Sequence, residues 1–502
     1  MADYFAALGV CLEPLNLILL FVCVVAGIIF GAVPGLNGSL GISLLLPITF
    51  GLSQSASFSM LCGMYVGGVS GGFISSVLLG IPGTPSAIAT CYDGHPMSQK
   101  GETSRALGLG IIGSFIGEVL AVLIASALCT VIADLALMLG PWEYFSLCVC
   151  AISLVVALSK GRMAKGIMAA AIGLLLSCVG LDPITGCARF TFGNKALTGG
   201  IDMTALMLGA YALSQIAKSY AKGNQKLQVF DSRNIKGIGV KLKDFTSNIK
   251  TIFSSLMIGL WIGFLPGMGS ALSNMVSYSF AKSTSKHPEK FGTGCAEGIL
   301  ASEVSNNAAT GGALIPMIAL GIPGDSATAL LLAALTIHGL TAGPLMIQQH
   351  PVTSYMIFGF MLVGAVLVLI IELAAKRWFP YILRIPYHYL YTIILVMCFI
   401  GAFTSTNMGF NMVVMLFIAV LALLMDMAGV PMTPLVLAFI LGKKIEEYLR
   451  KGMTYSSEGW VMFFTRPASL IFLLIAAASI LIPVLKPLFA KGKPAKEWVA
   501  DD

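Results

Sequence analysis

Long apolar stretches alternate with short polar ones along nearly the whole chain, and this pattern predicts membrane-spanning helices. A transmembrane helix needs about 20 predominantly apolar residues. Between Pro14 and Tyr92 the sequence contains no Asp, Glu, Lys or Arg. Such a long uncharged stretch predicts helices that lie in lipid or inside a membrane bundle.

Further apolar runs predict the remaining spans. In the first half of the chain the runs cover 15–33, 58–79, 106–139, 145–158, 164–179 and 201–216, with a shorter uncharged piece at 40–52. In the second half they cover 252–265, 299–337, 354–373, 390–403, 412–425 and 470–485. The predicted fold class is an all-α polytopic membrane protein with about 12 transmembrane helices.

A basic segment divides the chain into two parts. Between Lys218 and Lys250, eight basic residues stand against two acidic ones. Cytoplasmic loops of membrane proteins are enriched in Lys and Arg, so this segment predicts a cytoplasmic linker. The predicted organisation is a first membrane repeat at 1–217, the basic linker at 218–250, and a second membrane repeat with extra C-terminal helices at 251–502.

The two parts carry matching motifs in the same order, which indicates a duplication. Gly-Ala-Val-Pro-Gly-Leu-Asn-Gly at 31–38 is similar to Gly-Phe-Leu-Pro-Gly-Met-Gly-Ser at 263–270, and Leu-Gly-Ile-Pro-Gly occurs at both 79–83 and 320–324. An odd number of crossings between an acidic external N-terminus and the cytoplasmic linker would turn the second copy over. We therefore expect two inverted repeats with Pro-Gly broken helices or re-entrant loops.

Composition excludes a soluble enzyme. Hydrophobic residues make up 57% of the chain and charged residues only 11%, against roughly 25% charged in an ordinary soluble domain. The net charge of +7 comes from short basic stretches between apolar segments, which membrane topology explains better than nucleic-acid binding. The sequence shows no nucleophilic triad, metal cluster or Walker motif, so we predict neither an enzyme nor a bound cofactor.

The paired Pro-Gly motifs are the strongest candidates for a binding site. Proline followed by glycine breaks a helix, and the freed backbone groups survive at membrane depth only within protein or beside a water-filled cavity. In broken-helix transporters the N-termini of half-helices present N–H groups and a positive dipole end to an anionic substrate. The alternative, a packing kink at a small-residue helix contact, stays open.

The predicted substrate- or ion-binding residues gather at these four breaks. Their hydroxyl and amide groups offer oxygen ligands to Na⁺ or donors to a carboxylate, and the break glycines are expected to leave room for a close approach. The set consists of Pro34, Gly35, Asn37, Gly38, Ser39, Pro82, Gly83, Thr84, Ser86, Pro266, Gly267, Gly269, Ser270, Pro323, Gly324, Asp325 and Ser326.

Glu303, Asn306 and Asn307 form a second candidate group. They stand at i, i+3 and i+4, hence on one helix face, in the most apolar part of the second half. A carboxylate facing lipid there would cost about 2.5 to 3.5 kcal/mol on insertion scales, so we expect a site that faces the bundle interior. An interhelical hydrogen-bonding clamp is the alternative. Glu118, after Gly113 and Gly117, is a weaker candidate, typical of a helix interface.

These motifs, in this order, resemble the large membrane subunit of the tripartite tricarboxylate transporters. The resemblance covers most of the chain from Gly31 to Pro467. Two departures are Ser302, where such proteins usually have proline before the Glu303 position, and Asp325, an acid where small neutral residues are common. The resemblance rests on the motifs at 33–38, 79–85, 93–94, 100–101, 140–144, 180–182, 189–193, 265–269, 303–308, 312–316 and 320–324.

The resemblance implies an ion-coupled secondary transporter of the bacterial inner membrane. It would import di- or tricarboxylates such as citrate, together with a small four-helix membrane subunit and a periplasmic solute-binding protein. Na⁺ is the expected coupling ion, with H⁺ as the alternative. Other readings are a stand-alone carrier that needs no binding protein, an intramembrane enzyme using Glu303 with Asp325 or His338, and a scaffold without a ligand.

Overall fold

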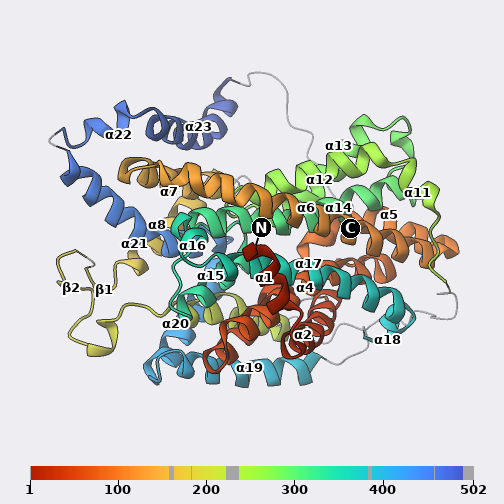
Figure 1. Ribbon diagram of the computed structural model, residues 1–502, viewed down its shortest axis with the longest axis horizontal. Helices are drawn as coiled ribbons and strands as arrows, with labels where there is room; N and C mark the ends of the chain where they lie inside the picture. Colours follow the sequence, from red (N-terminus) through yellow and green to blue (C-terminus); the bar gives the residue numbers. More distant parts are fainter. Residues whose placement is uncertain are drawn as a thin grey trace.

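The computed structural model describes residues 2–34, 36–157, 163–182, 184–221, 237–382, 387–456 and 458–489. Within these ranges the chain is a bundle of helices with one two-stranded antiparallel sheet, formed by β1 (Gly180–Leu181) and β2 (Ala188–Arg189). Figure 1 shows this hairpin at the left edge, projecting from the helical bundle. The predicted all-α class is confirmed.

Two helices in the first half of the chain are interrupted. After α1 (Ala2–Cys11), the first interruption separates α2 (Pro14–Ala32) from α3 (Gly38–Leu45) and η1 (Leu46–Gly51). The second separates α4 (Gln54–Leu79) from η2 (Pro85–Ala87), α5 (Ile88–Met97) and η3 (Ser98–Glu102). The remaining elements are α6 (Thr103–Leu137), α7 (Pro141–Ala157), α8 (Met163–Ser177), η4 (Lys195–Leu197), α9 (Met203–Met207), η5 (Leu208–Leu213) and α10 (Ser214–Ala221).

The second half repeats the two interruptions and then adds further helices. After α11 (Leu242–Thr246), one interruption separates α12 (Ile249–Phe264) from α13 (Gly269–Thr284), and the other separates α14 (Ala296–Leu320), after η7 (Pro288–Lys290), from α15 (Ser326–Ile337). The elements that follow are α16 (Pro344–Gln349), α17 (Pro351–Ala375), η8 (Lys376–Trp378), α18 (Phe379–Ile382), α19 (Tyr387–Thr404), α20 (Phe410–Met427), α21 (Met432–Tyr455), α22 (Val461–Thr465) and α23 (Pro467–Phe489).

Length and composition identify a membrane protein. Among the described residues, five helical stretches are long and apolar enough to cross a bilayer, and seven shorter apolar helices accompany them. Large apolar side chains stand on the outer faces of several helices, for example Ile18, Leu135 and Phe417, each more than half exposed. Those faces suit contact with lipid rather than water.

The two helix pairs that carry the motifs pack in the same way. In the first half α2 lies along α4, and a Cβ on Gly27 would come within 2.8 Å of the Met64 carbonyl oxygen. In the second half α12 lies along α14, and a Cβ on Gly263 would come within 2.8 Å of the Ala309 backbone. Since real Cβ atoms do not approach backbone so closely, only glycine allows either helix pair to come this near.

The two halves interleave in one bundle. Helix α6 of the first half packs on α14 of the second, where a Cβ on Gly311 would lie 2.8 Å from the Ala121 backbone. The single apolar run predicted at 299–337 is in fact interrupted between α14 and α15. Helix α21, which the apolar pattern did not predict, packs on α7 and α8. The domain boundaries stay a prediction, because residues 222–236 of the linker lie outside the described ranges.

Candidate functional site

The four chain interruptions meet at one cavity. This cavity has a volume of about 310 Å³, at the lower end of the range for small-molecule sites. The starts of α3, η2, α13 and α15 line it, together with the middle of α4 and one residue of α21. The lining residues are Asn37, Gly38, Ser39, Tyr65, Gly68, Val69, Thr84, Pro85, Ser86, Gly267, Met268, Gly269, Ser270, Ala271, Asp325, Ser326, Ala327 and Thr433.

Glycine geometry explains how the two long helices end before the cavity. Gly80 caps the end of α4 and Gly321 caps the end of α14, with φ angles of 68° and 66°. This left-handed conformation closes a helix, and glycine adopts it without a steric penalty. In the second half the Gly267 N–H also donates to the Gly324 carbonyl oxygen over 2.7 Å, which joins its two interruptions. The motif Gly-Ile-Pro-Gly therefore ends a helix and returns the chain to the cavity in both halves.

The helices that start at the cavity differ in how their first N–H groups are used. Asn37 caps α3 by accepting from Leu40 N at 2.7 Å, and Asp325 caps α15 by accepting from Thr328 N at 2.8 Å. Among the described residues, no side chain caps α13 or η2. The first-turn N–H groups of α13, at Gly269, Ser270 and Ala271, have no intrahelical partner by the geometry of a helix start. The cavity therefore has backbone donors and a positive dipole end on the α13 side.

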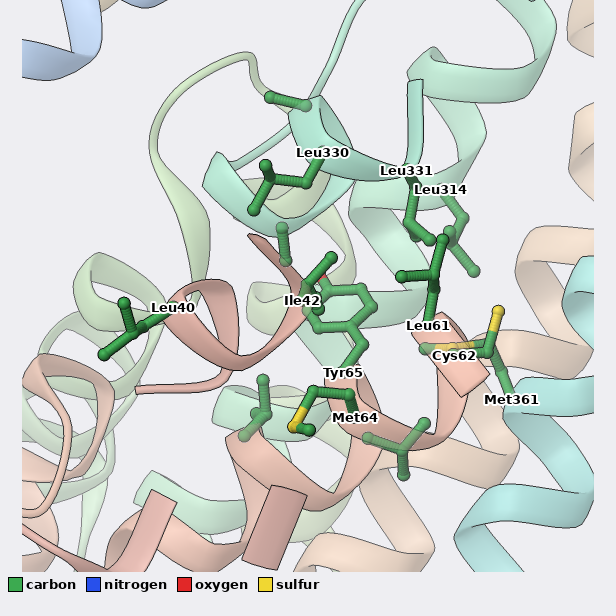
Figure 2. Close-up of a cluster of buried hydrophobic side chains, with 14 of the residues drawn as sticks. Leu40, Ile42, Leu61, Cys62, Met64, Tyr65, Leu314, Leu330, Leu331 and Met361 are labelled. Carbon is green, nitrogen blue, oxygen red and sulfur yellow. The ribbon is translucent and has the colours of Figure 1, made fainter. Parts of the chain in front are cut away.

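Tyr65 and Asp325 form the acidic side of the cavity. The Tyr65 hydroxyl donates to the Asp325 carboxylate over 2.6 Å, across the two halves of the chain. Figure 2 shows an apolar cluster around Tyr65 to which α3, α4, α14, α15 and α17 each contribute labelled side chains. This packing fixes the tyrosine, which in turn fixes the Asp325 carboxylate at the cavity wall.

Part of the predicted set lies at the cavity. Ten predicted residues line it: Asn37, Gly38, Ser39, Thr84, Ser86, Gly267, Gly269, Ser270, Asp325 and Ser326. Pro323 lines a small adjoining hollow of about 10 Å³. The other predicted break residues, Pro34, Pro82, Gly83, Pro266 and Gly324, are absent from both linings, and Gly35 lies outside the described residues.

Gly83 and Gly324 are small for a reason that differs from the predicted one. A Cβ on Gly83 would lie 2.7 Å from the Ser75 Oγ and would collide with the Gly31 carbonyl oxygen. A Cβ on Gly324 would lie 2.7 Å from the Gly263 carbonyl oxygen. In each half, then, the second interruption packs against the first one. The space that these two glycines leave is filled by backbone and side-chain atoms of the protein itself.

Glu303, Asn306 and Asn307 lie deeper in the bundle and are not part of the cavity lining. Glu303 accepts hydrogen bonds from Thr90 of α5 and from Ser114 of α6, the latter over 3.1 Å. The Asn306 side-chain nitrogen lies 3.4 Å from the Val69 carbonyl oxygen, on the helix that lines the cavity. The Asn307 side-chain nitrogen donates to the Glu303 carbonyl oxygen, within its own helix. Glu303 and Asn306 thus bond to other helices, as the interhelical clamp alternative expects, whereas the Asn307 bond stays within α14.

Sequence reasoning missed eight lining residues: Tyr65, Gly68, Val69, Thr433, Pro85, Met268, Ala271 and Ala327, the last four of which directly adjoin predicted residues. The first three lie in the middle of α4, where a buried apolar run contains no motif that would set them apart. Thr433 stands at the start of α21, in the C-terminal region whose helices the hydropathy pattern resolved least. Tertiary packing of α4 and α21 brings these residues to the cavity, and the sequence alone does not reveal that packing.

A larger cavity of about 750 Å³ lies beside α2 and α17 but has different chemistry. Its lining consists of Val25, Ile28, Ile29, Ile371, Ala375, Trp378, Phe379 and Tyr381. Those side chains offer almost no groups that could orient a carboxylate. The smaller polar cavity is therefore the candidate site.

The hairpin after α8 is fixed to α21 by ion pairs. Arg189 donates to both oxygens of Glu446, at 2.7 and 2.9 Å, and Arg450 lies 3.0 Å from Asp182. The backbone N–H groups of Thr185 and Ile184, and in addition the guanidinium groups of Arg450 and Arg189, lower the pKa of Asp182 to about 2. Glu143, at the start of α7, pairs with Arg466 at 3.1 Å. Arg189 and Glu143 thus have structural partners outside the cavity.

Comparison with known proteins shows which family the sequence matches. The sequence profile described as "Tripartite tricarboxylate transporter TctA family" matches residues 17–437. An "uncharacterized 52.8 kDa protein in TAR-I ttuC' 3'region" of Agrobacterium vitis is 33% identical over 492 residues, covering 98% of this chain and 97% of the relative. An "uncharacterized protein in TAR-II ttuC' 3'region" of the same organism is 32% identical over 244 residues, covering 49% of this chain and all of the relative. No solved structure matches.

Proposed function

Since the chain belongs to the tripartite tricarboxylate transporter TctA family, we propose that it is the large transmembrane subunit of an ion-coupled importer of small di- or tricarboxylates such as citrate. The observation that carries the proposal is the convergence of four helix starts on one polar cavity. The importer would reside in the bacterial inner membrane and work with a small four-helix membrane subunit and a periplasmic solute-binding protein.

The α13 side of the cavity suits a carboxylate. The first turn of α13 offers backbone N–H groups and a positive dipole end, and each such end favours an anion by about 0.3 to 1 kcal/mol, or more when partly buried. The hydroxyls of Ser39, Ser86 and Ser270 line the same cavity and can donate to carboxylate oxygens. An anion placed there would satisfy donors that would otherwise remain unpaired at membrane depth.

The Asp325 carboxylate disfavours a negatively charged substrate group on its side of the cavity. Its carboxylate already occupies the start of α15, so this helix end is not available to a substrate carboxylate. An acidic wall favours a substrate hydroxyl or a protonated carboxyl group at that end. The cavity therefore suits a small hydroxylated carboxylic acid with its charge concentrated toward α13.

Opposite orientation of the two repeats is also part of the proposal, and the contacts of α17 support it. Near the start of α17, the Cys11 thiol lies 3.5 Å from the Met356 carbonyl oxygen, just before α2 begins. At the other end of α17, Lys376 bonds to Ser104 at 3.0 Å, and the neighbouring Arg105 pairs with Asp244, just before α12 begins. Helices α2 and α12 thus enter from opposite ends of α17, as an inverted repeat requires.

The proposal is tested by uptake of labelled citrate and related carboxylates into proteoliposomes that contain the chain and its small membrane partner. We expect uptake that requires an ion gradient and the cognate binding protein. Uptake that is unchanged without the binding protein would favour a stand-alone carrier. If no carboxylate enters under a Na⁺ or H⁺ gradient, the proposed transport function is wrong.

A further inference from the structure

Two fully buried carboxyl groups lie close to α4, whose residues line the cavity. Glu303 lies on α14 and Glu372 lies on α17, and both have 0% exposure. Consecutive residues of α4 connect them: Ser70 bonds to Glu372, and the Val69 carbonyl oxygen lies 3.4 Å from the side-chain nitrogen of Asn306, one turn after Glu303. In the described part of the chain, every hydrogen-bond partner recorded for either carboxyl is a neutral group. Two neighbouring carboxyl groups without a cation cannot both ionise in a low-dielectric interior.

The hydrogen bonds of Glu372 also indicate that the pair holds a proton. The Ser70 hydroxyl lies within hydrogen-bonding distance of both carboxylate oxygens of Glu372, at 3.1 and 3.2 Å. A hydroxyl has a single hydrogen, whereas an ionised carboxylate has about four acceptor sites. An ionised Glu372 would therefore be short of donors as well as of positive charge. A proton bound to the pair neutralises one negative charge and also turns one acceptor oxygen into a hydrogen-bond donor.

Asn306 supplies an independent observation that indicates a bound proton. Its side-chain amide lies within hydrogen-bonding reach of the Glu303 carboxyl. Its oxygen is fully buried and has no hydrogen-bond donor in the described part of the chain. Amide nitrogen and oxygen exchange places by a half-turn of the side chain, so a protonated Glu303 is the donor that this oxygen lacks.

We propose that the Glu303–Glu372 pair binds the coupling ion of this transporter and that the ion is a proton. This inference rests on the proposed function. Binding forms an O–H bond on one carboxylate oxygen and removes one negative charge from the bundle, and release returns the proton to water on the other side of the membrane. Na⁺, the coupling ion expected from the sequence, is thereby replaced by H⁺.

The pair is connected to the cavity through α4. Ser70, which bonds to Glu372, follows Val69, which lines the cavity. The Val69 carbonyl oxygen is the acceptor of the Asn306 side-chain nitrogen. When Asn306 turns its oxygen toward a protonated Glu303, this nitrogen leaves the Val69 carbonyl. Proton binding is thus linked to the wall against which the substrate lies.

The other ionisable groups on the surrounding elements have separate partners or weaker influence. The Cys91 thiol of α5 lies 3.7 Å from the Ala87 carbonyl oxygen, and Lys376, one turn after Glu372, bonds to Ser104. The remaining groups on elements packed against the pair are Asp3, Tyr4, Cys11, Cys23, Cys62, Tyr65, Tyr92, Asp93, His95, Arg105, Glu118, Cys129, Asp134, Lys250, Tyr278, Lys282, Glu297, Tyr355 and Arg377. Asp93, for example, accepts from Tyr278 and from three backbone N–H groups.

The test uses the chain with its small membrane partner in proteoliposomes and compares two assays with labelled citrate. Net uptake driven by an inward proton gradient requires proton release, whereas exchange of internal for external citrate does not. Glu303→Gln and Glu372→Gln imitate the protonated state at nearly constant volume. We expect each variant to lose net proton-driven uptake at least tenfold while exchange stays within twofold of wild type.

Glu118→Gln is the matched control, because Glu118 is also buried, on α6, and accepts from a hydroxyl, that of Thr310, while no hydrogen bond within the described residues joins it to either member of the pair. Net uptake in this variant should equal that of wild type. Net uptake preserved in both pair variants, or driven by a Na⁺ gradient with no response to pH, would overturn the proton assignment. Failure of the proposed function looks different, since wild type would then show no citrate exchange at all.

Discussion

The two Gly-Ile-Pro-Gly interruptions are nearly identical in backbone geometry and opposite in chemistry. Each follows a helix closed by a left-handed glycine, and each packs a glycine against the other interruption of its half. In the first half the next residue is Thr84, whose hydroxyl bonds to Ser86 at 2.9 Å. In the second half it is Asp325, whose carboxylate caps α15 and accepts from Tyr65. The duplicated scaffold thus keeps its shape while one matched position makes the cavity neutral on one side and acidic on the other.

The largest expected effect comes from a substitution that makes the neutral, first-half side of the cavity acidic. Thr84→Asp would place a second carboxylate in the cavity, and two unit charges about 5 Å apart repel by about 3 kcal/mol at an effective dielectric of 20. We expect citrate binding to weaken about 100-fold. Equilibrium binding of labelled citrate to the purified complex measures this. Thr84→Asn, which adds no charge, is the control, and equal weakening in both variants would contradict the electrostatic explanation.

The shared backbone geometry is tested at the two packing glycines. Gly83→Ala and Gly324→Ala each force a Cβ against backbone or side-chain atoms within 2.7 Å, and such overpacking costs about 1 to 3 kcal/mol. We expect both variants to unfold at lower temperature in detergent, by similar amounts. Gly51→Ala, where no atom lies within 4 Å of the new Cβ, should leave the unfolding temperature unchanged. Destabilisation of only one of the two packing variants would show that the halves are not equivalent.

The opposite substitution removes the Asp325 charge, so that the cavity is neutral on both sides. Asn at position 325 can still cap α15 through its side-chain oxygen, so Asp325→Asn should fold normally. Loss of the charge should improve binding of tricarboxylates relative to dicarboxylates about tenfold, which corresponds to about 1.4 kcal/mol. Competition assays with both classes give the ratio. An unchanged ratio would mean that Asp325 does not face the substrate charge.

The smallest expected effect concerns the hairpin after α8, which has no counterpart in the matched motifs of the second half. The pKa of Asp182 in the folded protein is about 2, below the ordinary value of about 3.9. Its ionised form therefore stabilises the hairpin fully above about pH 4, and this contribution is lost as the pH falls toward 2. Limited acid-protease cleavage at 184–199 should rise over that interval. In Asp182→Asn the cleavage should be high throughout, and a flat profile in wild type would contradict the assignment.

Much of the fold could be read from the sequence because lipid imposes long apolar helices. The predicted runs at 15–33, 58–79 and 354–373 correspond closely to α2, α4 and α17. Helix α21 escaped prediction because its second half carries charges such as Lys444, which bonds to the Gly321 carbonyl oxygen at the end of α14. That charge is compensated by a tertiary contact, and local hydropathy does not report such contacts.

The site was predictable where backbone breaks leave a motif and unpredictable where packing alone supplies the residue. The Pro-Gly pairs correctly marked the four interruptions, and ten of the predicted residues line the cavity. Tyr65 and Thr433 reach it from an uninterrupted helix and from the C-terminal region, so no local pattern identifies them. Glu303 was predicted as part of a binding site, and the structure places it outside the cavity lining, in a separate buried cluster. Glu372 was not predicted, since its role depends on its contact with Ser70.

The most direct test of the central claim is saturable binding of labelled di- and tricarboxylates to the purified complex, before and after the cavity is filled. Ser270→Phe places a large side chain at the start of α13, whereas Ser254→Phe adds the same group on α12, away from the cavity lining. The account predicts that wild type and Ser254→Phe bind a carboxylate and that Ser270→Phe, although folded, does not. Wild-type binding by a folded Ser270→Phe variant, or no carboxylate binding by wild type, would contradict it.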